Sequence, residues 1–161
     1  MSMMLPGSFF DLSLCGHPEL FRTDEPVWTV LDRLHDYIDS LFQGSWPLAG
    51  HAGMVESPLV IANGELRHDL TIHSPGSGKS IRAFDGDDPL EDAAIVMPGA
   101  YLFDDRIIIG AGSVVEPGAL IKGPVVIGAR TEVRQGAYMR GDCLAGDDWL
   151  QLGWFNRRDR L

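Results

Sequence analysis

The sequence has few cysteines and no long apolar run. Its two cysteines, Cys15 and Cys143, lie far apart without CxxC spacing, so we expect neither a disulfide framework nor a zinc site, and no bound metal. No apolar run approaches the roughly 20 residues that a membrane-spanning helix needs. Residues 1–17 lack the basic start of a signal peptide. These features predict a soluble protein of the reducing cytoplasm.

Basic residues are also scarce. The 161 residues contain 13 Lys and Arg against 23 Asp and Glu, a formal charge of −10. Nucleic acid is therefore not expected as the main partner, because a phosphate backbone attracts clustered cations. With 45% hydrophobic residues, the chain is long enough for one globular domain with a core.

Residues 1–45 predict an N-terminal segment followed by an amphipathic helix. Thr23, Asp24, Glu25 and Pro26 form a helix start. Apolar residues then recur at helical spacing, and charged residues occupy the other face. The apolar set is Val27, Trp28, Val30, Leu31, Leu34, Tyr37, Ile38, Leu41 and Phe42. We expect this helix to pack on the main body, with binding to a partner as the alternative.

Residues 46–94 predict an irregular region that contains one hairpin. The segments PLVIA and ELRHDLTIH flank an Asn63-Gly64 turn, and the acidic loop FDGDDPLED follows. The segment HSPGSGKS is similar to a phosphate-binding loop. His73 stands where that motif needs glycine, and no apolar helix follows Ser80. We therefore do not expect a nucleotide-binding loop here.

Residues 95–150 contain hexapeptide repeats. From Ile109 the chain divides without a gap into IGAGSV, VEPGAL, IKGPVV, IGARTE, VRQGAY, MRGDCL and AGDDWL. Three hexads make one turn of 18 residues, which predicts vertical pairs one turn apart. Ile109 should lie under Ile127 and Ala145, Val115 under Val133, and Ile121 under Met139. The inward residues Val115, Ile121, Ile127, Val133 and Met139 should be buried.

An earlier turn precedes these hexads and carries one extra residue within LFDDRII, which should bulge outward at a corner. Small residues recur at a second inward position, each after a turn glycine: Ala100, Ala119 and Ala137 after Gly99, Gly118 and Gly136. An antiparallel sandwich would need hairpin turns that the stretch lacks. The repeats therefore predict an all-β fold, a parallel β-helix of hexapeptide repeats preceded by the amphipathic helix.

The repeat pattern resembles the left-handed β-helix transferases with the motif [LIV]-G-x-x-[small]-x. More narrowly, FFDLSLCGHPELF, PVWTVLDRLHDYI and VVEPGALIKGPVVIGARTEVRQGAYMRGD resemble stand-alone relatives of the acetyltransferase half of bifunctional N-acetylglucosamine-1-phosphate uridylyltransferase. The likeness covers about 45 N-terminal residues and residues 95–147. It implies a left-handed fold, a homotrimer, acetyl-CoA as donor, and a sugar phosphate or sugar nucleotide such as UDP-N-acetylglucosamine as ligand.

The resemblance carries over one functional residue, Arg140 in GAYMRGD, which matches an arginine that holds the sugar phosphate. The family's lysine, catalytic histidine, tyrosine and asparagine belong to later turns that this sequence lacks, so no catalytic residue is assigned. All five histidines precede the hexads, which disfavours the zinc-dependent carbonic-anhydrase branch and weakens acetyl transfer. His68 or His73 could fold back as a base. We expect little or no acetyltransferase activity.

The 18-residue register places Arg140 on Lys122 at about 4.8 Å along the backbone, and like charges in adjacent strands repel. Either both side chains extend into water, or an anion such as a phosphate or carboxylate lies between them. Arg134 should pair with Glu116. Cys143 falls at the inward position of Val125 and is expected to pack in the core.

The hexad pattern breaks at Trp149 and Gln151, and residues 151–161 are interpreted as an atypical tail. The tail is interpreted either as a cap over the open end of the sheets or as a truncated or frame-shifted end. The leading function is an N-acetyltransferase of an amino-sugar phosphate that uses acetyl-CoA, within the acyltransferase and nucleotidyltransferase family, active or inactive. The alternative is a non-catalytic β-helix module for assembly or ligand binding.

Overall fold

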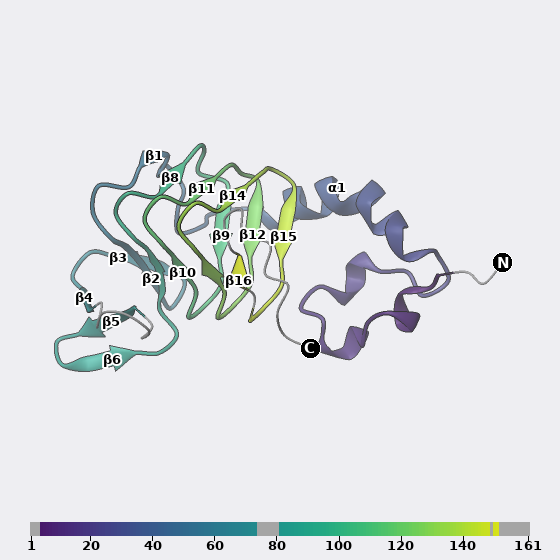
Figure 1. The fold of residues 1–161 in the computed structure, drawn as a ribbon, viewed down its shortest axis with the longest axis horizontal. Helices are drawn as coiled ribbons and strands as arrows, with labels where there is room; N and C mark the ends of the chain where they lie inside the picture. The colour runs from purple at the N-terminus through teal and green to yellow at the C-terminus, as the bar shows by residue number, and fades with distance from the viewer. Residues whose placement is uncertain (1–3, 74–80, 149, 152–161) are drawn as a thin grey trace.

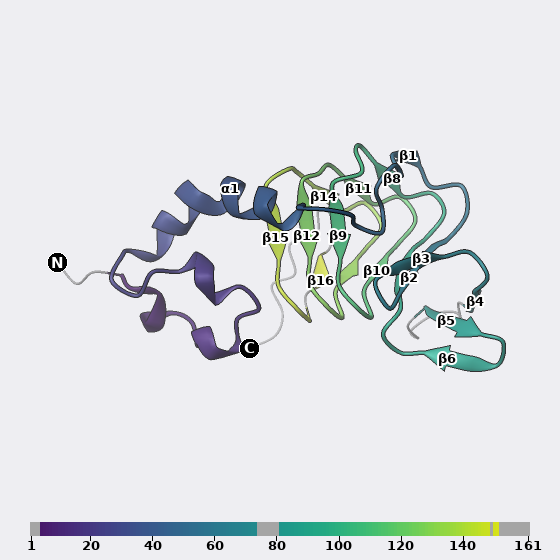
Figure 2. The same cartoon turned by 180° about the vertical axis from the view of Figure 1, so that it is seen from behind.

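The computed structural model describes residues 4–73, 81–148 and 150–151, and Figure 1 shows them as one elongated body. The N-terminal segment forms three short 3-10 turns, Pro6–Ser8, Leu12–Leu14 and Pro18–Leu20. The expected helix begins with a fourth turn, Val27–Val30, and continues as α1, Leu31–Leu41. Both views place this segment at one end of the molecule, beyond strand β15 (Figures 1 and 2).

Helix α1 contacts the main body through its C-terminal half. Ile38 and Phe42 are buried against Val126, which confirms the prediction of a surface helix packed on the body. The first half of the predicted apolar face is not buried against the body. Trp28 is 54% exposed and Leu31 is 68% exposed. The helical periodicity predicts which residues share a face, but not how much of that face the body reaches.

Sixteen strands are formed by the described residues. The region before the hexads gives β1 Gly53–Met54, β2 Leu59–Ala62, β3 Glu65–Arg67, β4 Thr71–His73, β5 Arg82–Asp85 and β6 Asp88–Leu90. The repeat region, residues 94–151, gives β7 Ala94–Val96, β8 Tyr101–Leu102, β9 Ile107–Ile109, β10 Val114–Val115, β11 Leu120–Ile121, β12 Val125–Ile127, β13 Glu132–Val133, β14 Tyr138–Met139, β15 Cys143–Ala145 and β16 Leu150–Gln151.

The predicted fold class, an all-β left-handed parallel β-helix behind an amphipathic helix, is wrong. Within the described residues, the strands are divided among four small sheets, none of them closed. Their orders are β1-β8-β11-β14, β16-β13-β10-β7-β2-β3, β15-β12-β9 and β4-β5-β6. Two of these sheets mix parallel and antiparallel pairs. The physical reason lies in residues 53–67, because β1 pairs antiparallel with β8, and β2 pairs antiparallel with both β7 and β3.

The pairing register within the repeat region is the one that the hexads predict. Ile127 lies between Ile109 and Ala145, Val133 pairs with Val115, and Met139 pairs with Ile121, all in parallel strands. The five residues predicted to point inward are buried, and so are the three alanines at the second inward position. Apolar residues at every sixth position therefore form one continuous core between the sheets.

The extra residue of the first repeat also lies where it was predicted. Leu102 pairs with Ile121, 19 residues on, whereas Ile107 pairs with Val125, 18 residues on. The insertion therefore falls between Leu102 and Ile107, and the inward residues on both sides stay in register.

The hairpin predicted around Asn63-Gly64 is confirmed. Ala62 pairs with Glu65 across the turn, and Asn63 and Gly64 have φ values of 54° and 79°. Two successive positive φ values are what a two-residue hairpin turn requires. The second predicted strand divides, since β3 extends the six-stranded sheet while β4 joins the separate sheet with β5 and β6.

Several predictions fall outside the described residues. The HSPGSGKS segment lies mostly in residues 74–80, and most of the tail lies in residues 152–161. The domain boundaries at residues 45, 94 and 150 stay predictions. Among residues 4–73, 81–148 and 150–151, no helix has the length and apolar content to cross a membrane.

Candidate anion site

The outer face of the four-stranded sheet carries two columns of side chains. Register places Met54, Tyr101, Leu120 and Tyr138 in the first column. The next outward position along each strand forms the second column, Phe103, Lys122 and Arg140, linked by backbone bonds from Phe103 N–H to Ile121 O and from Lys122 N–H to Met139 O. The buried residues Leu102, Ile121 and Met139 alternate between the two columns.

The second column brings together both predicted site residues. Lys122 and Arg140 follow directly after the paired strands β11 and β14, and both are exposed. Neither side chain has a hydrogen bond or an ion pair with another described residue. The register thus puts two unpaired cations on adjacent strands, as predicted, while their role in binding stays a prediction.

The first column is apolar and open. Tyr138 is 50% exposed, Phe103 in the second column is 49% exposed, and their ring centroids lie 6.2 Å apart. Tyr101 and Phe103 are in edge contact at 4.9 Å. An outer face with aromatic rings beside cations can receive the plane of a sugar or base together with a charged group.

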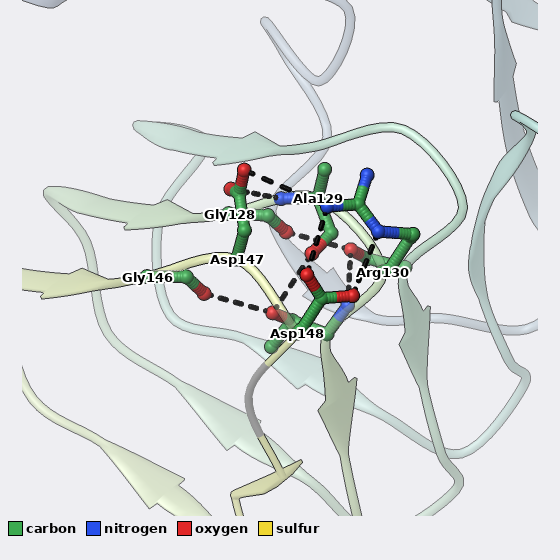
Figure 3. A network of polar contacts seen from close by, with 8 residues as sticks. Gly128, Ala129, Arg130, Gly146, Asp147 and Asp148 are labelled. Carbon is green, nitrogen blue, oxygen red and sulfur yellow. Dashed lines mark hydrogen bonds and ion pairs between the residues drawn. The ribbon is translucent and has the colours of Figure 1, made fainter. Parts of the chain in front are cut away.

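Arg130, in the hexad IGARTE, is paired. The Arg130 guanidinium donates to both carboxylate oxygens of Asp148, at 2.7 and 2.9 Å, and Asp147 accepts from the Ala129 N–H at 2.8 Å (Figure 3). Arg130 and Asp148 both have positive φ, so these contacts also hold two strained corners together. Arg130 is therefore a structural residue of its corner.

Arg134 behaves in the same way. Its Nη2 lies 2.6 Å from Glu132, and its Nε lies 4.0 Å from the Glu116 carboxylate, which confirms the predicted ion pair between repeats. Glu116 also accepts the Gln135 N–H at 2.9 Å. These two carboxylates raise the pKa of Arg134, with the Glu132 hydrogen bond as the larger cause. Arg134 is thus an exposed arginine with partners, unlike Arg140.

His35 on α1 lies beside this region, which the sequence analysis did not predict. Its Nδ1 lies 2.7 Å from Oδ1 of Asp142, and its Nε2 lies 3.5 Å from Oδ2 of Asp39. Asp142 comes two residues after Arg140, at the corner that leads into β15. No local signal could find this pair, since 107 residues separate its members.

The surroundings of His35 favour its protonated form. The hydrogen bond with Asp142 raises the pKa of His35 most, followed by the charges of Asp142 and Asp39. Asp39 in turn pairs with Arg106, and this hydrogen bond lowers the pKa of Asp39. Carboxylates at both ring nitrogens favour the protonated imidazole, and in that form His35 is a neutralising partner for Asp142.

Cys143 pairs in register with Val125, which confirms its predicted position. The side chain is partly buried, and this burial raises the pKa of its thiol. His68 and His73 lie on or beside β3 and β4, outside the repeat region. Within the described part of the chain, no three His, Cys, Asp or Glu side chains form a group that could hold a metal ion.

Comparison with known proteins returns no match: no protein-family model, no curated protein and no solved structure is similar to the chain at a significant level. The family suggested by the hexapeptide motif therefore stays a prediction.

Proposed function

We propose that this protein binds an anionic sugar, a sugar phosphate or a sugar nucleotide, through Arg140 and Lys122 on the outer face of the four-stranded sheet. One observation carries the proposal: two cations in adjacent strands have no acidic partner among the described residues. Like charges in neighbouring strands destabilise each other, and a bound phosphate would remove that cost while accepting charge-assisted hydrogen bonds from both.

The aromatic residues beside these cations fit the sugar or base of such a ligand. Tyr138 precedes Arg140 by two residues on the same outer face, so its ring lies in the neighbouring column. A ligand held by its phosphate at Arg140 can therefore place an apolar face against Tyr138 or Phe103. The charge would supply most of the affinity, and the rings would select among anions.

Assembly is a second function, favoured by the exposure of the first column. Met54 and Leu120 belong to the same column as Tyr138 and are also exposed, and an apolar sheet face of this kind is usually covered. We propose that further copies of the chain cover it, as a homotrimer, and that the anion site lies at the edge of the contact. The two cysteines, neither in a disulfide, fit our proposal of a cytoplasmic location.

We propose binding without turnover as the activity of this chain. Transfer of an acetyl group from acetyl-CoA to an amino-sugar phosphate needs a base beside the acceptor amine. His35 contacts Asp142 in the hexads, and its two carboxylate neighbours favour the protonated form, which cannot accept a proton. Acetyl-CoA would then act, at most, as a ligand whose phosphates occupy the same cations.

The test is calorimetric titration at low salt with glucosamine 1-phosphate, UDP-N-acetylglucosamine and acetyl-CoA. Loss of one charge-assisted contact should weaken binding roughly tenfold in Arg140→Ala and in Lys122→Ala. Arg134→Ala is the matched control, because Arg134 is exposed on the same repeat turn but already paired. Arg140→Ala should melt at or above the parent's temperature, since one of two repelling charges is gone. Equal affinities of parent and Arg140→Ala, or no binding by the parent, would refute the proposal.

The same proteins can be examined for assembly by sedimentation equilibrium. The parent should sediment as a trimer, and Tyr138→Asp should sediment as a monomer with an unchanged far-UV spectrum. A monomeric parent would exclude assembly through this face without affecting the anion site.

A further inference from the structure

Asp142 places a negative charge next to the proposed anion site. Only Gly141 separates it from Arg140, and the Asp142 N–H donates to the Pro124 carbonyl at 2.9 Å, which anchors the corner between β14 and β15. A free carboxylate at this position would repel a bound phosphate and compete with it for the Arg140 guanidinium. The contact with His35 at 2.7 Å is what offsets this charge.

We propose that His35 makes anion binding at Arg140 and Lys122 dependent on pH by neutralising Asp142 only while its imidazole is protonated. This inference rests on the proposed function and names a regulation of the same site. Below the pKa of His35 the pair is an ion pair with no net charge, and Arg140 is available to the ligand. Above that pKa the imidazole is neutral, the Asp142 charge is exposed to the ligand, and affinity falls.

The groups that face His35 come from three parts of the fold. Asp142 comes from the corner before β15, Asp39 and Asp36 come from α1 itself, and Arg106 comes from the turn between β8 and β9. Arg106 pairs with Asp39 and so offsets its charge. Asp142 is therefore the carboxylate whose charge depends most on His35.

The burial of α1 keeps His35 in place whatever its charge. Ile38, one helical turn further on, is fully buried, and Phe42 packs against Val126 and under the Arg106 guanidinium at 5.0 Å. Loss of one exposed ion pair costs far less than uncovering these apolar side chains. Titration of His35 therefore changes the charge beside Arg140 without moving the helix away.

The direction of the effect follows from the pKa of His35, which its carboxylate neighbours raise above the ordinary value of 6.5. Protonation, and hence strong anion binding, should persist through the mildly acidic range. Affinity should decline as the pH rises through the raised pKa.

The experiment measures the affinity for inorganic sulfate, whose charge is constant over the range, by NMR titration between about pH 5 and about pH 8. For the parent we expect a decline of roughly two- to fivefold, the effect of one exposed charge. His35→Gln should bind weakly at every pH, whereas His35→Lys and Asp142→Asn should bind strongly at every pH. His17→Gln is the control, because His17 lies in the N-terminal segment and bonds to Tyr37 of α1, so this variant should leave the parent's profile unchanged.

The outcomes separate this inference from the proposed function. A parent that binds sulfate with the same affinity at every pH, or an Asp142→Asn variant that keeps the parent's decline, would overturn the role of His35 and leave the site standing. If neither sulfate nor the sugar phosphates bind to the parent, the proposed function fails and the regulation with it. Far-UV spectra establish whether each variant is folded. If His35→Lys does not fold, Asp142→Asn alone tests whether removing the Asp142 charge abolishes the pH dependence.

Discussion

Replacing Ile121 by alanine tests the inward register most directly, because its neighbour Leu120 on the same strand supplies the control. Ile121 is fully buried and lies between the buried Leu102 and Met139. Leu120 points to the opposite face and is 40% exposed. The two side chains have the same number of carbon atoms, so any difference in cost comes from their surroundings.

The expected cost follows from the burial. Ile121→Ala removes three carbon atoms from the core, worth about 2.4 kcal/mol at about 0.8 kcal/mol for each buried methylene. The cavity left between two flanking strands adds to this, for a total of about 2–5 kcal/mol. Leu120→Ala leaves no closed cavity and removes a half-covered side chain, so we expect about 1 kcal/mol.

The assay is urea unfolding followed by far-UV circular dichroism, at a concentration at which sedimentation shows monomer, so that assembly does not enter the comparison. For a chain of this length, each kcal/mol lowers the melting temperature by roughly 2–4 °C. Equal costs for the two variants, or a larger cost for Leu120→Ala, would show that the alternation of inward and outward residues along β11 has been misread.

Two further predictions concern the N-terminal segment. Arg22 and Arg33 hold the pKa of Glu25 at about 2, below its ordinary 4.5. The stability that this carboxylate provides is therefore present above pH 4.5 and is lost as the pH falls toward 2. In thermal melts over this range, the melting temperature of Glu25→Gln should fall less than that of the parent. Ile38→Ala should cost about 2–5 kcal/mol in urea unfolding, whereas Trp28→Ala, on the less covered half of the helix face, should cost only about 1 kcal/mol. Equal costs at Ile38 and Trp28 would contradict the half-packed position of α1.

The hexads predict pairing so well because each one obeys the same local rule. Every sixth residue is apolar, and a one-residue shift would expose the whole inward set, so Val115, Ile121 and Ile127 can pair in only one register. This rule concerns neighbours within the repeat region alone. It says nothing about the strands that join its sheets from elsewhere.

The predicted fold class is wrong because strands from outside the repeat region pair with strands of the repeats. β2 was expected to form a hairpin with the next strand, and it does so with β3. Its other edge also pairs antiparallel with β7, which makes the six-stranded sheet a mixed one. Strand alternation shows which side chains share a face. It does not show which backbone edge will find a partner, because every strand carries the same donors and acceptors.

For the candidate site too, the sequence pattern predicts some of the residues that lie together and not others. Lys122 and Arg140 are one repeat apart, so their proximity follows from the period. His35 belongs to a helix with a period of its own, and no sequence rule relates the phase of α1 to a corner of the repeats. Its position over Asp142 depends on where the helix is anchored.

Part of that anchor is the stretch of the first repeat that carries the extra residue, between Leu102 and Ile107. Within this stretch, the Asp105 carbonyl accepts from Trp46 Nε1 at 2.7 Å, and the Asp105 carboxylate accepts from the Gly50 N–H at 2.7 Å. Arg106 pairs with Asp39, one turn beyond His35 on α1. The stretch that carries the insertion thus adds polar contacts to the apolar packing of Ile38 and Phe42 on Val126, and together they hold His35 at the corner that follows Arg140.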